Sequence, residues 1–173
     1  MIVTTDIANI IFKDCKAFGI SEMYQRGNIP EGEVKTERIV IYPKAQQPDA
    51  YWEKGYVEVN LCVPVTKTGK ANLIRLNELE RNAREMFKDG IVGQYDGSWY
   101  RYSSESIGIE EDKELCCYYV NVKLLFFSPA VSLKNIPFEG VITEADSGKI
   151  VVKGDGTNGC GLTAVSYTHL TLP

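Results

Sequence analysis

The sequence predicts an α+β fold with two layers, in which a mainly antiparallel four-stranded sheet carries two helices on one face, in the order α-β-β-α-β-β. Three patterns support this prediction. Residues 56–65 alternate apolar and polar, as a half-buried strand does. Residues 73–87 place apolar side chains three and four positions apart, which is typical of a helix with one buried face. Residues 98–127 contain two long strand-like runs, which predict a hairpin.

The first predicted element is a helix that follows possible capping side chains at positions 4–6. Its apolar positions recur at helical spacing; they are Ile7, Ile10, Ile11, Cys15 and Phe18. Gly19 is expected to end this helix. A short strand is predicted at 38–42, where Pro43 closes it. The polar segment 44–55 is predicted to be a long loop or a β-excursion.

The clearest strand is predicted at 56–65, followed by the second helix. The apolar members of the strand share one face; they are Val57, Val59, Leu61, Val63 and Val65. Pro64 cannot donate a backbone hydrogen bond, so the end of this strand is expected to be an edge or a bulge. The helix buries a stripe made of Leu73, Leu76, Leu79, Ala83, Met86 and Phe87. Gly90 is expected to end it.

The last two strands of this predicted domain lie at 98–107 and 115–127, joined by an acidic turn at 110–113. The second strand alternates, and one of its faces is predicted to hold Cys116, Tyr118, Val120, Val122, Leu124 and Phe126.

The chain is predicted to divide into three parts. Residues 1–130 form the α+β domain, and residues 131–164 form a glycine-rich C-terminal appendage or truncated fragment with weak strands at 140–143 and 149–153. Residues 165–173 resemble the conceptual translation of a transposon-type sequencing-library adaptor. We expect this last run to be an artefact. The alternative is a genuine C-terminal strand.

Composition limits the classes of function. The formal net charge is −4, whereas electrostatic nucleic-acid binders usually present a basic face. Sequence-specific nucleic-acid binding is therefore not expected. The densest apolar run, 120–127, is much shorter than the roughly 20 residues that span a bilayer, so no membrane association is expected. The N-terminus lacks a basic signal-peptide region, and we expect a cytoplasmic protein.

Few residues suggest catalysis. His169 is the only histidine and lies in the adaptor-like run, so imidazole chemistry has no other candidate. The cysteines are odd in number and show no C-x-x-C spacing, which favours reduced thiols; they are Cys15, Cys62, Cys116, Cys117 and Cys160. No catalytic residue, cofactor site or metal ligand is assigned, and the chain is not expected to be an enzyme.

Two groups of residues could in principle form a binding or catalytic site. Residues 154–159 satisfy G-x-G-x-x-G, but no helix or downstream acid follows, so a turn or a flexible tail is preferred over a dinucleotide site. An acidic group could supply paired carboxylates or bind a hard cation; it contains Glu105, Glu110, Glu111, Asp112 and Glu114. At the tip of a hairpin, such a group is more often simply solvated.

The hairpin region is rich in aromatic residues, namely Tyr95, Trp99, Tyr100, Tyr102, Tyr118 and Tyr119. Aromatic side chains interleaved with basic ones can stack on nucleic-acid bases. Only Arg101 and Lys123 are basic within these strands, so core packing and protein–protein contact are the favoured uses.

The order of the predicted elements and the general character of the sequence also suggest a family. The chain resembles tail-terminator or tail-completion (head–tail joining) proteins of long-tailed bacteriophages and prophages. The resemblance is carried by RIVIYP at 38–43, YVEVNLCVP at 56–64, RLNEL at 75–79 and YVNVKL at 119–124, and it covers roughly residues 1–130.

This resemblance implies a small subunit that assembles into a ring, usually a hexamer, where it ends tube polymerisation and contributes to the head–tail joint. Its implied partners are further copies of itself and the phage tail-tube and head-connector proteins. Its implied location is the host bacterial cytoplasm and then the virion. Segments 44–55 and 103–114 are expected to supply contacts, with Tyr51, Trp52, Glu105, Ile107 and Ile109 as the named candidates. The alternative function is a cytoplasmic ligand- or RNA-binding α+β module without catalysis.

Overall fold

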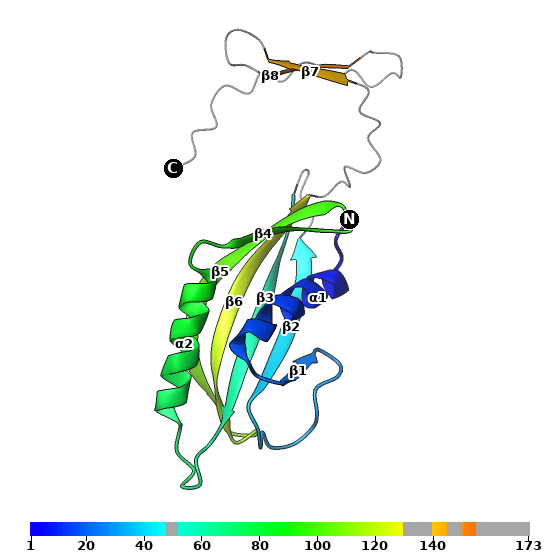
Figure 1. Ribbon diagram of the computed structural model, residues 1–173. Helices are drawn as coiled ribbons and strands as arrows, with labels where there is room; N and C mark the ends of the chain where they lie inside the picture. Colours follow the sequence, from blue (N-terminus) through cyan, green and yellow to red (C-terminus); the bar gives the residue numbers. More distant parts are fainter. Residues whose placement is uncertain (48–51, 130–139, 145–149, 155–173) are drawn as a thin grey trace. The chain divides into compact units, whose positions relative to one another are not determined.

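The computed structural model describes residues 1–47, 52–129, 140–144 and 150–154 (Figure 1). The chain divides into two units, Met1–Leu133 and Lys134–Pro173. In the second unit, β7 (Gly140–Glu144) and β8 (Ile150–Gly154) form an antiparallel hairpin, and both lie where weak strands are predicted. Several predictions lie outside the described residues: those for Tyr51, for Cys160, for most of the G-x-G-x-x-G motif and for 165–173.

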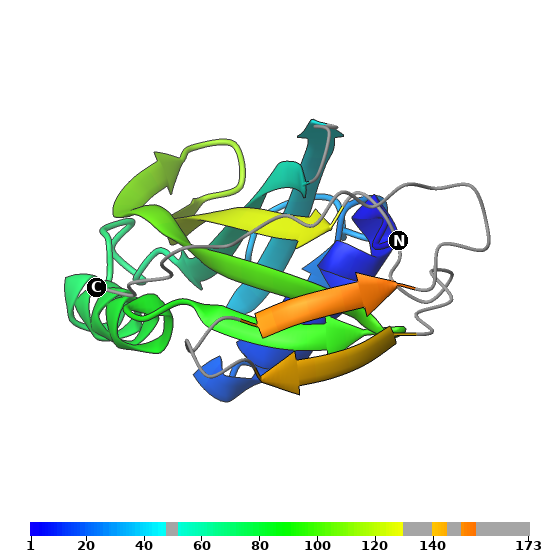
Figure 2. The same cartoon turned by 90° about the horizontal axis from the view of Figure 1, so that it is seen from above.

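The first unit has a mixed sheet of six described strands. Its elements are α1 (Thr4–Cys15), the 3₁₀ turn η1 (Lys16–Phe18), β1 (Glu22–Gln25), β2 (Arg38–Gln47), β3 (Trp52–Pro64), α2 (Leu73–Phe87), β4 (Ile91–Tyr95), β5 (Ser98–Asp112) and β6 (Cys117–Pro129). The strand order is β1-β2-β3-β6-β5-β4. β1 pairs in parallel with β2, and the other neighbours are antiparallel. The strands twist relative to one another (Figure 2).

The predicted four-stranded, mainly antiparallel sheet in the order α-β-β-α-β-β is wrong. The described sheet is six-stranded, mixed and curled into a half-barrel, with three strands before α2 and three after it. The two strands that the prediction lacks are β1, with 4 residues, and β4, with 5. Strands this short contain too few residues for alternation to stand out from a loop.

Both predicted helices form where the sequence places them. The Asp6 carboxylate accepts a hydrogen bond from the backbone N–H of Val3 at 3.0 Å, which satisfies a free donor at the start of α1. Gly19, at φ 71°, follows η1 in the left-handed conformation that a side chain disfavours. The Asn72 side chain caps α2 by accepting from the Arg75 N–H at 3.3 Å.

The main core lies between the helices and one face of the sheet, which we call the inner face (Figure 1). The strands contribute Ile39, Ile41, Val57, Val59, Leu61, Val63, Tyr102, Val120, Val122, Leu124 and Phe126, and the helices contribute Ile7, Ile10, Ile11, Cys15, Leu76, Leu79, Ala83 and Phe87. The alternation predicted for β3 is confirmed, because its odd-numbered residues from 57 to 63 are buried. In β6 the alternation also holds, but Cys116 lies in the preceding turn at φ 49°.

The opposite, outer face of the sheet is covered at one end. Val34, Val40, Cys62 and Cys117 form a second buried cluster there, and the backbone N–H of Val34 donates to the carbonyl of Leu115 at 2.9 Å. The connection between β1 and β2 therefore packs over the outer face near the β5–β6 turn. Within the described part of the chain, neither helix combines the length and the apolar character that crossing a membrane requires.

Candidate functional site

The middle of the outer face is polar and internally paired. The Asn121 amide donates to the Asn60 side-chain oxygen at 2.9 Å, from the strand beside it. Lys44 pairs with Glu58 at 2.7 Å. Charges and amides in this region therefore satisfy one another.

Beyond this polar region, the outer face ends in a group of apolar side chains, which we call the aromatic surface. It consists of the exposed Trp52, Val92 and Trp99 and the half-buried Leu125 and Phe127, with the cations Lys54 and Arg101. Trp52 is 53% exposed, Trp99 50% and Val92 64%. Large apolar groups left in water at one place on a surface commonly mark an interaction site.

Strand pairing brings these residues together from four strands. Lys54 of β3 is the partner of Phe127 in β6, Phe127 is the partner of Arg101 in β5, and Arg101 is the partner of Val92 in β4. Directly paired residues of antiparallel strands point to the same face, about 5 Å apart. The four side chains therefore form one continuous row across the sheet.

The two cations of the aromatic surface, Lys54 and Arg101, differ in their ion pairing from the lysines elsewhere on this face. Among the described residues, no carboxylate forms an ion pair with Lys54 or Arg101, whereas Lys44 and Lys123 each have one within 2.7 Å. Within the described residues, the two cations of the aromatic surface therefore have no ion-pair partner, although the chain as a whole is acidic.

The predicted contact residues fall on both faces. Trp52 belongs to the aromatic surface. Glu105 lies on the outer face, where its carboxylate pairs with Lys123 at 2.7 Å and accepts a hydrogen bond from Tyr56 Oη at 3.3 Å. The hydrogen bond with Lys123 lowers the pKa of Glu105. Ile107 and Ile109 are half-buried and pack against the inner-face core.

A register shift explains this division. Between Ser104 and Ser106, β5 contains a bulge at which Glu105 is the extra residue. Before the bulge, odd-numbered residues such as Arg101 face outward; after it, odd-numbered residues such as Ile107 face inward. A one-residue shift moves every following side chain to the other face.

The predicted acidic group is divided between the bulge and the end of the hairpin. At that end, Glu110 accepts a hydrogen bond from Tyr119 Oη at 2.8 Å, and Glu111 accepts one from Tyr118 Oη at 2.9 Å. The pKa of Tyr118 is raised chiefly by its hydrogen bond to Glu111. Within the described ranges, no three His, Cys, Asp or Glu side chains gather in a way that could hold a metal ion.

The thiols are mostly buried. Burial, together with a smaller contribution from the neighbouring Asp14, raises the pKa of Cys15 from 9.0 to about 12. Cys62 and Cys117 lie beside the buried Arg38, whose Nε has no hydrogen-bond partner among the described residues. The hydrogen bond between these two thiols raises the pKa of Cys62 and lowers that of Cys117. Both are at most 4% exposed, so neither thiol is placed to meet a substrate.

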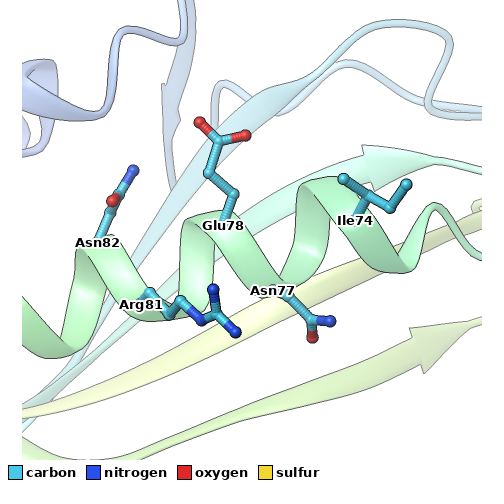
Figure 3. Close-up of a pocket in the computed structure, with 5 residues that line it drawn as sticks. All are labelled: Ile74, Asn77, Glu78, Arg81 and Asn82. Atoms are coloured by element: carbon cyan, nitrogen blue, oxygen red, sulfur yellow. The ribbon is translucent and has the colours of Figure 1, made fainter.

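Two shallow hollows occur on the described surface. One follows the exposed side of α2 and is lined by Ile74, Asn77, Glu78, Arg81 and Asn82 (Figure 3). All five belong to one helix, so the hollow lacks a second wall of side chains. The other, of about 210 Å³, lies at the β5–β6 turn and includes Glu111, Lys113 and Cys116 in its lining.

The sequence interpretation missed most of the aromatic surface. Of its members, Trp52 alone is among the named contact candidates; Val92, Trp99 and Phe127 are not. A signal was present, because Asp96-Gly97 is a typical two-residue hairpin turn, and Trp99 follows Gly97 by two residues. In the structure both turn residues have positive φ, 46° and 71°, and the turn places Gln94 opposite Trp99.

Comparisons with known proteins give little further information. No protein-family model matches the chain, and no curated protein matches it. One solved structure, which carries only a sequence identifier as its name, has a TM-score of 0.47 and 14% identity, and the match covers 72% of this chain and 93% of that chain. No family membership follows from these comparisons.

Proposed function

We propose that this protein is a structural virion-assembly subunit, a ring-forming tail terminator or head–tail joining protein of a phage or prophage. The observation that carries the proposal is the aromatic surface. Trp52 and Trp99 are half exposed on a sheet face that no helix of the described unit covers. Tryptophan and arginine are enriched where proteins bind one another, so this surface suits a subunit interface.

Two further observations support an assembly role. The resemblance to tail-terminator proteins is carried entirely by segments of the first unit, namely 38–43, 56–64, 75–79 and 119–124. The described hollows are shallow, and the one on α2 is lined by exposed side chains, which suits a protein surface better than a small-molecule site.

The test is a measurement of mass and shape on the full chain. Sedimentation across a range of concentrations should reveal a closed oligomer, and negative-stain microscopy should show rings. Incubation with the tail-tube protein of the same phage or prophage should place rings at tube ends. A chain that remains a monomer at all concentrations and ignores the tube protein would contradict the proposal.

A second candidate function rests on a specific observation. Trp52 and Trp99 lie beside Lys54 and Arg101, which have no ion-pair partner among the described residues, and single-stranded nucleic acids bind to aromatic side chains flanked by positive charge. The same surface would serve a cytoplasmic RNA-binding module. Titration with a single-stranded oligonucleotide separates the candidates, because base stacking should quench tryptophan emission from a monomer without any change in protein mass.

A further inference from the structure

The β5–β6 hairpin carries opposite charges at its two ends. One end contributes Arg101 and Phe127 to the aromatic surface. The other end is the acidic turn, residues 110–114, which holds four exposed or half-buried carboxylates and one lysine. In the described part of the chain, none of these four carboxylates forms an ion pair.

These two regions cannot meet within one molecule. Arg101 lies near the start of β5, and Asp112 is the last residue of that strand. At about 3.3 Å for each residue, the stretch between them spans roughly 36 Å. A cationic surface and an acidic turn that are complementary but held apart can pair only between two copies.

We propose that the aromatic surface of one copy binds the acidic turn of a second copy. This inference rests on the proposed assembly role and names the contact through which subunits join. The contact is head to tail, because it joins two different regions, the aromatic surface of one copy and the acidic turn of the next. A pair of copies therefore still has one free aromatic surface and one free acidic turn, to which further copies can bind. Interfaces of this kind close into rings when the rotation between subunits permits it.

The chemistry of the two regions fits such a contact. Trp52 and Trp99 supply apolar anchors, and Lys54 and Arg101 supply charge-assisted hydrogen bonds to carboxylates. The acidic turn is already ordered, because Tyr118 and Tyr119 hold two of its carboxylates and Asp112 Oδ1 accepts from the Leu115 N–H at 3.0 Å. Less conformational entropy is therefore lost when the turn binds.

Charge reversal in the full chain tests the contact. The surface variant combines Lys54→Glu with Arg101→Glu, and the turn variant combines Glu110→Lys with Glu111→Lys. Each should weaken self-association by roughly tenfold or more in sedimentation experiments, since each reversal places like charges against one another across the contact. The matched controls are Arg81→Glu on α2 and Glu31→Lys in the β1–β2 connection. Both are exposed, and both should associate like the wild type.

Mixing the two reversed variants gives the sharper result. In the mixture, the acidic surface of the surface variant faces the basic turn of the turn variant. The surface of the turn variant and the turn of the surface variant are both unchanged, so the contact between them is the wild-type one. Association should return in the mixture, in assemblies with an even number of subunits. Tryptophan emission should shift to shorter wavelength on assembly, because both tryptophans of the chain belong to the aromatic surface. Circular dichroism checks that every variant is folded.

Each outcome has a distinct meaning. Loss in both variants with rescue in the mixture supports the contact. If the wild type and both variants form the same oligomer, the contact is refuted while the assembly function stands. If the wild type never associates with itself, the contact is refuted, and the assembly function is refuted with it when the chain also ignores the tail-tube protein. A wild-type monomer whose tryptophan emission responds only to single-stranded RNA would refute both and favour the nucleic-acid alternative.

Discussion

Tyr102 and Asp14 join the sheet to α1 through a hydrogen bond of 2.5 Å between the buried phenol and the carboxylate. The Tyr102 ring packs among Phe87, Tyr100 and Phe126. Replacing it with phenylalanine keeps the ring and removes the donor. We expect Tyr102→Phe to lower the free energy of unfolding by about 1–2 kcal/mol, as measured by urea denaturation. An unchanged midpoint would show that the bond contributes nothing net.

Alkaline pH should destabilise the fold through two buried acids. Burial, followed by the hydrogen bond to Asp14, raises the pKa of Tyr102 above its ordinary value of 10.0, and burial raises that of Cys15 from 9.0 to about 12. A raised pKa means that the folded state favours the protonated group. The stabilisation is therefore complete below about pH 9 and is lost as pH rises, at up to about 1.4 kcal/mol per pH unit for each group. Denaturation from pH 8 to pH 11 should show this slope, and Tyr102→Phe should reduce it above pH 10.

The pair between Arg75 and Glu37 should couple α2 to the start of β2. Arg75 donates through Nε at 2.9 Å and through Nη2 at 2.8 Å, so the contact is bidentate. A double-mutant cycle with Arg75→Ala and Glu37→Ala should give a coupling of about 1 kcal/mol, and salt should reduce it. The more exposed pair between Arg84 and Glu80 is the matched control and should give less than about 0.5 kcal/mol. Equal coupling in both pairs would contradict the role of the bidentate geometry.

The turn before Trp99 should be sensitive to substitution at Gly97. This residue has φ 71°, where a Cβ is disfavoured. Gly97→Ala should destabilise the protein by about 1 kcal/mol and should alter tryptophan emission by loosening the β4–β5 hairpin. Gly108→Ala is the control, because Gly108 does not have a positive φ and a Cβ there meets no atom within 4 Å. A larger loss at Gly108 than at Gly97 would contradict this account.

The sequence predicts the elements with strong periodicity and misses those without it. The alternation around Val59 and the stripe through Leu76 depend only on local spacing, and both elements form at the predicted positions. β1 and β4 are too short for such a pattern, and their pairing with β2 and β5 depends on tertiary contacts. The strand count, and with it the fold class, was therefore predicted incorrectly.

The position of the candidate site depends on features that a single sequence does not reveal. Glu105 and Ile107 are two residues apart, so strict alternation places them on one face. The bulge separates them, and nothing in the polar run around Ser104 marks it. The exposure of Trp99 likewise depends on which face the helices cover, and tertiary packing decides that.

The electrostatic character of the aromatic surface can be tested without any partner, because both tryptophans of the chain lie in it. Lys54 and Arg101 should concentrate iodide and repel caesium near the indole rings. Iodide should therefore quench the emission of the monomer more strongly than caesium does at equal ionic strength.

The double variant Lys54→Glu/Arg101→Glu should reverse this order, whereas the control Arg81→Glu makes the same kind of charge change on α2 and should preserve it. Adding neutral salt should reduce the difference between the two quenchers, since salt shortens the screening length, which is about 10 Å at an ionic strength of about 0.1 M. Equal quenching by both ions in the wild type would mean that the cations do not govern the field at Trp52 and Trp99, and the attraction for an acidic partner would then lose its physical basis.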